Sequence, residues 1–309
     1  YLSPVAAASF DNVLITFGGG IIPTNGDFAA FNVIEAHQAD LRVTNSVLEE
    51  NADGTGGSAP AERFGRSANA AATIFARGTQ PILIGNTVRN NAGPFVSINV
   101  NALNSTYVAD TGRSRGGADL FGGYEDNQGP LIDGNLLGGN GINGMVVRGE
   151  VLTTQSVWDD TDIVHVLFDE VIDPNFHTYG GIRLNSDSDA SLVVKLQGDD
   201  AGFTAGGKPL DIDDRIGGTL QVVGQPFFPV ILTSFSDDTV GAGFDLAGLP
   251  LTDTNGDGAS TGVVGDWRSL EITQYANDRN VGVYNENEVT AAIGAGTNST
   301  ARDAEFIGD

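Results

Sequence analysis

The sequence predicts an all-β chain that winds through similar coils, a β-solenoid. An Asn/Gly phrase recurs three times, as VTNSVLEENADG from Val43, IGNTVRNNAGP from Ile84 and DGNLLGGNGING from Asp133. Apolar residues come in short alternating runs and show no sustained helical period of about 3.6 residues. The 43 glycines, with many Asn, Asp, Thr and Ser residues, disfavour long helices. Amides that recur from coil to coil therefore favour a solenoid.

The expected strands follow the alternating runs in order. In the first half these runs lie at 13–17, 31–33, 41–43, 82–84, 96–100 and 145–147. Every second residue in them is apolar, which is the pattern of a half-buried strand. After Gly149 the runs become denser, with VHVLFDEVI from Val164 and IRLNSDSDASLVVKL from Ile182. We expect these to continue the solenoid, and a separate β-sandwich-like module is the alternative.

The repeated asparagines are expected to form a structural ladder. The first Asn of each phrase is Asn45, Asn86 or Asn135, and the second is Asn51, Asn91 or Asn140. Intervals of 41 and 49 residues between the first asparagines are long for one coil. Each interval is therefore expected to hold two coils, or one coil with a projecting loop, and 52–72 and 110–129 are the candidate loops. A ladder role removes these asparagines from the candidates for catalysis.

The Asn/Gly phrases resemble the right-handed parallel β-helix repeat of pectate lyases, tailspikes and many bacterial surface proteins. In that family inward asparagines form amide ladders at a coil corner, which is the role implied for Asn45, Asn86 and Asn135. VWDDTDIVHVLFDEVI from Val157 and DTNGDGASTGVVGDWRSLEITQYANDRNV from Asp253 are similar to stretches of very large secreted planctomycete and cyanobacterial proteins. The resemblance implies a right-handed parallel β-helix with projecting loops, whose C-terminal part can be irregular but β-rich. It also implies that the chain belongs to an extracellular scaffold.

Two segments are expected along the chain. Residues 1–287 form the β-helix with its loop insertions, with a sub-boundary near residue 150 where the texture changes. Residues 288–309 are small, polar and non-periodic, which is typical of a linker to a further module. The chain begins at Tyr1 and has neither a recognisable signal peptide nor an apolar stretch of membrane-spanning length. We expect a mature or excised piece of a secreted protein with no membrane span.

Composition and motifs limit the function classes. The net charge of −25, from 40 acidic and 15 basic residues, disfavours nucleic acid as a partner and attracts divalent cations or cationic surfaces. The chain contains no cysteine, so disulfides and thiolate sites are excluded. No GxSxG or HExxH motif occurs, and no catalytic residue is assigned. His165 alternates with Val164 and Val166 and is expected to be a paired or exposed strand residue rather than a base.

The run DTNGDG from Asp253 is the sharpest local signal. Oxygen ligands at alternate positions, with Gly in the sixth, resemble the start of an EF-hand or dockerin loop that wraps Ca²⁺. The expected ligands are Asp253, Asn255 and Asp257. Asp266 could substitute for the twelfth residue, because Val264 stands where a bidentate acid is wanted. The alternative is a simple turn.

We expect a non-catalytic structural module, adhesive or filament-forming, that acts as a stiff rod. Its expected partners are further copies of itself docked head to tail, neighbouring modules of the same polypeptide, or a polysaccharide. The alternative is a calcium-dependent polysaccharide lyase or a carbohydrate-binding β-helix. For that alternative Tyr124, in a Gly-rich loop, could stack on a sugar, and Arg113 and Arg115 could contact an acidic one.

Overall fold

The computed structural model describes residues 6–24, 27–54, 68–104, 129–174, 181–206, 218–273 and 276 of the 309-residue chain. Within these ranges the regular structure is β-strand, apart from one 3-10 turn, η2 (Val100–Ala102), and no α-helix occurs. The predicted all-β class is therefore confirmed. None of the helical structure in the described part of the chain is long and apolar enough to cross a bilayer.

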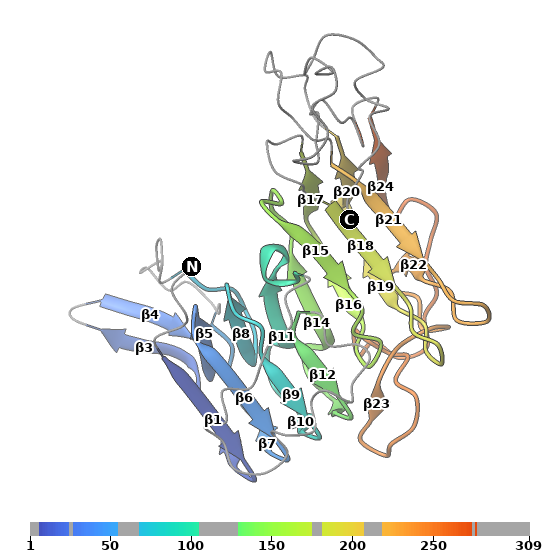
Figure 1. Cartoon of the computed structure of the whole chain (residues 1–309). Coiled ribbons are helices and arrows are strands. Elements are labelled where there is room, and N and C mark those ends of the chain that lie inside the picture. Colours follow the sequence, from blue (N-terminus) through green and yellow to red (C-terminus); the bar gives the residue numbers. More distant parts are fainter. Residues whose placement is uncertain are drawn as a thin grey trace, which may run out of the picture.

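The strands are short and follow one another in chain order across Figure 1. They are β1 (Ala7–Asp11), β2 (Leu14–Thr16), β3 (Gly20–Thr24), β4 (Asp27–Phe31), β5 (Ile34–His37), β6 (Asp40–Thr44), β7 (Val47–Glu49), β8 (Ile74–Arg77), β9 (Ile82–Ile84), β10 (Thr87–Arg89), β11 (Pro94–Asn99), β12 (Leu131–Asp133), β13 (Leu136–Gly138), β14 (Ile142–Arg148), β15 (Gln155–Trp158), β16 (His165–Leu167), β17 (Glu170–Asp173), β18 (Gly181–Asn185), β19 (Val193–Leu196), β20 (Gly198–Ala205), β21 (Leu220–Val223), β22 (Ile231–Ser234), β23 (Phe244–Asp245) and β24 (Trp267–Ile272).

Parallel pairing dominates the sheets. The largest described sheet has seven strands in the order β22-β19-β16-β14-β11-β8-β5, and others follow β1-β6-β9-β12 and β2-β7-β10-β13-β23. Two three-stranded parallel sheets, β15-β18-β21 and β17-β20-β24, hold the later strands. Only the β3-β4 hairpin among the described sheets is antiparallel. Strands far apart in sequence thus lie side by side in the same direction (Figure 1).

The three Asn/Gly phrases correspond to three equivalent sets of strands, β6-β7-β8, β9-β10-β11 and β12-β13-β14. β7 pairs directly with β10, and β10 pairs directly with β13. Each interval between phrases therefore contributes one set of strands among the described residues. The extra length falls largely in residues 55–67 and 105–128, which lie outside the described ranges.

A two-residue corner separates the first two strands of each set. Its first residue is Asn45, Gly85 or Gly134, and all three have positive φ, at 49°, 64° and 59°. Glycine adopts this left-handed conformation without steric penalty, and asparagine tolerates it better than most residues. The recurring Asn/Gly composition is thus explained by backbone geometry at the corners.

One large apolar cluster forms the main core, and two smaller clusters are separate from it. Equivalent positions stack in register, as Val43 on Leu83 and Leu83 on Ile132, and all three side chains are fully buried. The same cluster extends from Ile34 to Leu251. Strand β14 pairs with β16, so the seven-stranded sheet also runs across the change of texture near residue 150. Residues 288–309 lie outside the described part of the chain.

Candidate functional site

The first asparagine ladder contains Ser46, Asn86 and Asn135. The amide oxygen of Asn86 accepts the backbone N–H of Ser46 at 3.0 Å, and that of Asn135 accepts the backbone N–H of Asn86 at 3.0 Å. The Asn86 side chain also donates to the Asn135 oxygen at 2.9 Å. Asn45 does not belong to this ladder, which corrects the expectation: its exposed side chain donates to Asp11, because Asn45 occupies the left-handed corner position.

A second and more complete ladder runs through Asn51, Asn91 and Asn140. The amide oxygen of Asn91 accepts from the backbone and side chain of Asn51 at 3.1 and 2.9 Å. The amide oxygen of Asn140 likewise accepts from the backbone and side chain of Asn91, at 3.1 and 2.8 Å. Asn143 continues the ladder beyond Asn140, and Gly18 precedes it. Backbone groups at each corner, which no strand partner satisfies, are thereby hydrogen-bonded in the interior.

The predicted calcium loop lies in a cluster of three carboxylates. One oxygen each from Asp238, Asp253 and Asp257 lies within 4.8 Å of the others. Asp253 and Asp257 were expected from the sequence, whereas Asp238 comes from the loop after β22 and was missed. Carboxylate oxygens are the ligands that Ca²⁺ prefers, so this group has suitable chemistry for it.

The other two predicted ligands lie differently. Asn255 donates its side-chain amide to Asp257 at 2.9 Å and so supports the loop. Asp266 accepts from the Ser234 hydroxyl at 2.6 Å and from the Val263 backbone at 2.7 Å, and it is not a member of the three-carboxylate group. These two bonds lower the pKa of Asp266. Asp266 therefore closes its own turn by accepting from the backbone of Val263.

Lys195 places an ammonium group beside the acidic cluster. The side chain lies on β19, is fully buried, and donates to the carbonyl of Thr252 at 2.8 Å. Its Nζ is 3.8 Å from Asp238. Burial lowers the pKa of Lys195, and the nearby carboxylates of Asp238, Asp237 and Asp253 act in the opposite direction. A buried lysine requires such partners, and one lysine inside the apolar run LVVKL was the sequence signal for this arrangement.

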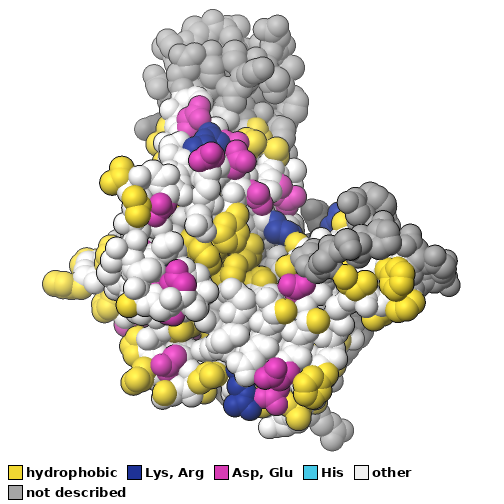
Figure 2. All heavy atoms as spheres, turned by 180° about the vertical axis from the view of Figure 1, so that it is seen from behind, with side chains coloured by type: hydrophobic (Ala, Val, Ile, Leu, Met, Phe, Trp, Pro, Cys, Tyr) yellow, Lys and Arg dark blue, Asp and Glu magenta, His cyan; other side chains and the backbone are white. Residues whose placement is uncertain are grey.

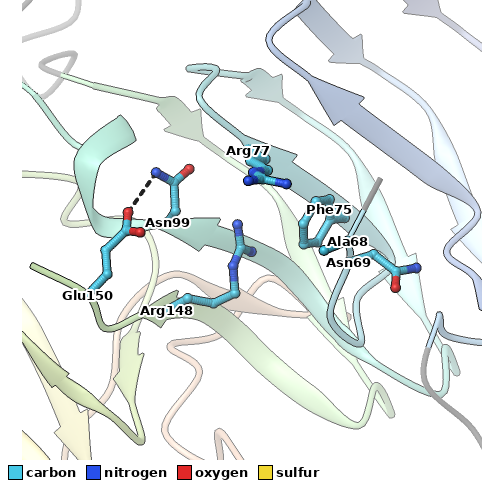
Figure 3. A pocket seen from close by; sticks show the side chains of 7 residues that line it. All are labelled: Ala68, Asn69, Phe75, Arg77, Asn99, Arg148 and Glu150. Carbon is cyan, nitrogen blue, oxygen red and sulfur yellow. Dashed lines mark hydrogen bonds between the residues drawn. The ribbon is translucent and has the colours of Figure 1, made fainter. Parts of the chain in front are cut away.

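A pocket of about 220 Å³ lies at the ends of β8, β11 and β14 (Figure 3). Arg77, Asn99, Arg148 and Glu150 line it with their side chains, and Phe75 forms part of its wall. Asn99 stands opposite Arg148 in the β11-β14 register. Two of the lining residues are cationic and one is anionic, in a chain whose net charge is −25. Figure 2 shows acidic side chains spread over one face and basic ones in few places.

Arg148 is held firmly at the edge of this pocket. Its guanidinium donates to the Ser97 hydroxyl and to the Ala76 carbonyl, both at 2.7 Å, and lies 4.3 Å from the centre of the Phe75 ring. Burial lowers the pKa of Arg148 to about 10, partly offset by Glu150. Arg148 remains cationic at neutral pH, with donors in fixed directions.

Two titratable groups are buried elsewhere. His165 is a strand residue, as expected, but it is fully buried and so is not the exposed one of the two alternatives; its ring stacks on Trp158 with ring centres 5.3 Å apart. Burial lowers the pKa of His165 to about 3. Asp173 is also buried, and desolvation raises its pKa to about 7. Strand alternation could not show that both faces of β16 are covered.

The predicted carbohydrate contacts Tyr124, Arg113 and Arg115 lie outside the described residues. The pocket of Figure 3 was not expected, because its two arginines, Arg77 and Arg148, are 71 residues apart in sequence and lie on different strands.

Comparison with protein-family models, curated proteins and solved structures finds no match to the chain.

Proposed function

We propose that the chain is a right-handed parallel β-helix that serves as a non-catalytic structural module of a secreted or cell-surface bacterial protein. In this proposal residues 1–287 form a stiff rod, and residues 288–309 connect it to neighbouring modules. The right hand is the one that parallel strand-crossover-strand units adopt in about 98% of cases. The observation that carries the proposal is the pair of amide ladders that joins successive sets of strands.

The ladders support a mechanical role because they hydrogen-bond each coil corner to the next. Asn51, Asn91 and Asn140 bond in series, while the apolar core stacks in register beside them. The three sets of strands that carry the Asn/Gly phrases are thus joined to one another by strand pairing, side-chain amides and buried apolar contact. This arrangement resists bending and extension without any moving part.

The ends of the stack support assembly with a second copy. Strands β1, β2 and β5 are the first members of their sheets, so each has one edge without a strand partner among the described residues. Leu14 and Phe17, at and just after β2, are 62% and 81% exposed. Unpaired strand edges beside apolar side chains are templates for pairing with another chain. Head-to-tail docking would bury them.

We therefore expect self-association through the β2 end. Leu14→Glu should lower the weight-average mass in sedimentation toward that of the monomer, because it places a charge at the docked end. Thr87→Glu is the matched control, since Thr87 and Leu14 share the register position of Val47 but Thr87 lies on an inner strand. Higher salt should strengthen association by screening the net charge of −25. A wild-type chain that stays monomeric at all concentrations would contradict docking.

The lyase alternative is tested on the same protein. A lyase that cleaves uronate polymers creates a carbon-carbon double bond and raises ultraviolet absorbance, whereas a scaffold leaves the absorbance unchanged. We expect no increase with or without calcium. A steady increase would replace the structural proposal with an enzymatic one.

Calcium binding at Asp238, Asp253 and Asp257 is a separate part of the proposal. The cluster supports it because three carboxylates converge beside a loop of the expected ligand spacing. Lys195 already supplies one positive charge, so we expect an affinity in the weak range of extracellular calcium modules, with a Kd of about 10⁻⁴ to 10⁻³ M. In this role calcium would stiffen the loop and would take no part in a reaction.

Calcium at tenfold above its Kd is expected to stabilise the chain by about 1.4 kcal/mol and to raise Tm by a few degrees. Asp238→Asn should abolish this increase, because it removes a ligand charge while leaving the DTNGDG turn intact. Asp245→Asn is the control, since Asp245 is an acid outside the cluster. An equal rise in Tm with magnesium, or a rise that persists in Asp238→Asn, would contradict a calcium site here.

A further inference from the structure

The pocket formed by Arg77, Asn99, Arg148 and Glu150 has the composition of a ligand site. We propose that it binds a small carboxylate that carries hydroxyl groups, which is the chemistry of an acidic sugar residue. This inference goes beyond the structural role and does not depend on self-association. It rests on the fixed guanidinium, the second cation beside it and the acceptor on the opposite wall (Figure 3).

The guanidinium groups select an anion. Arg148 is oriented by Ser97, Ala76 and the Phe75 ring, and its two hydrogen bonds use two of five N–H donors. Arg77 lines the same pocket from β8, which β11 separates from the β14 strand of Arg148. A planar carboxylate matches the paired donors of a guanidinium, and a fixed guanidinium loses little side-chain entropy on binding.

Glu150 and Asn99 select hydroxyl groups on the same ligand. One oxygen of Glu150 accepts from Asn99 at 3.0 Å and from Asn101 at 2.9 Å, so the carboxylate is held in place. Its other oxygen makes no hydrogen bond to a described residue and is an acceptor for a hydroxyl group. A dianionic phosphate would be repelled by Glu150, whereas a monocarboxylate with hydroxyls satisfies both walls.

The volume limits the ligand to a small one. Pockets for drug-sized molecules measure roughly 300–1,000 Å³. This cavity, at about 220 Å³, suits a single sugar residue. Phe75 is 2% exposed and is covered by Arg148, so recognition here relies on charge and hydrogen bonds and not on stacking of the sugar on an aromatic ring.

The test is titration calorimetry of the full chain with glucuronate and galacturonate, compared with glucose and galactose, in buffer with a calcium chelator. We expect binding of the acidic sugars, weakened by salt, and none of the neutral ones. If the monosaccharide uronate binds as tightly as a uronate oligomer, the ligand is a free acidic sugar. If the oligomer binds more tightly, the ligand is a polymer. Equal binding of neutral sugars, equal binding of inorganic sulfate, or no binding of any uronate overturns the proposal.

Variants with opposite expected effects make the test specific. Arg77→Gln should weaken uronate binding about tenfold or more, because a charge-assisted bond is lost. Arg89→Gln is the matched control, since Arg89 pairs with Glu49 on a different sheet. Glu150→Gln should strengthen binding by removing a repelling charge while keeping an acceptor oxygen. An unchanged affinity in both Arg77→Gln and Glu150→Gln, with circular dichroism unaltered, overturns the assignment.

Discussion

Asn91→Ala is expected to lower the free energy of unfolding by about 3 to 5 kcal/mol, which is a large effect for one residue. The Asn91 side chain is 3% exposed and makes four hydrogen bonds. Two are accepted from Asn51, and two are donated, to the Leu48 carbonyl and to Asn140. Alanine removes all four and leaves their buried partners unsatisfied, and each such group costs about 1 to 3 kcal/mol.

Urea unfolding followed by circular dichroism measures this loss. Asn185→Ala is the control, because Asn185 is a strand asparagine whose side chain accepts an exposed bond from Arg183. That variant should stay within about 0.5 kcal/mol of the wild type. If Asn91→Ala lost less than about 1 kcal/mol, the ladder would be an incidental contact and the mechanical argument would lose its basis.

The sequence repeat predicts an asparagine ladder but assigns the wrong residue to its first position. Asn45 and Ser46 are adjacent, and the repeat points to Asn45 because it matches the residue type of Asn86. The backbone selects differently: Asn45 takes the left-handed corner position that Gly85 and Gly134 take in the next sets, and Ser46 takes the inward one. Alignment on the second asparagines Asn51, Asn91 and Asn140, each five residues after the inward position, would have placed the register correctly.

The two candidate ligand sites show a second limit of sequence reasoning. Asp253 and Asp257 are close in sequence and were expected together, whereas Asp238 reaches them only through the path of the loop after β22. Arg77 and Arg148 meet because β8, β11 and β14 are neighbours in one sheet. Short-range spacing predicts turns and loop sites, but pairing order decides which distant side chains share a pocket.

His165→Phe is expected to change how stability depends on pH. The pKa of His165 in the folded chain is lowered to about 3 from an ordinary value near 6.5. The neutral ring therefore leaves the free energy of unfolding at its full value above pH 6.5. As pH falls from 6.5 toward 3 the free energy of unfolding decreases, because the unfolded chain takes up the proton first. Between pH 8 and pH 5 this loss amounts to about 2 kcal/mol. The pI of about 4.1 makes pH 5 a practical lower limit.

Asp173 acts with the opposite sign and provides the internal comparison. Its folded pKa of about 7 lies above the ordinary 3.8, so the native state takes up a proton first and stability rises as pH falls from 7. On acidification from pH 8 to pH 5, the free energy of unfolding of His165→Phe should therefore change by about 2 kcal/mol more in the stabilising direction than that of the wild type. The free energy of unfolding of Asp173→Asn should increase less than that of the wild type over the same range. Each comparison is made within one variant, so any packing change from the ring exchange cancels. Parallel pH profiles for all three proteins would mean that neither group is dry in the folded state.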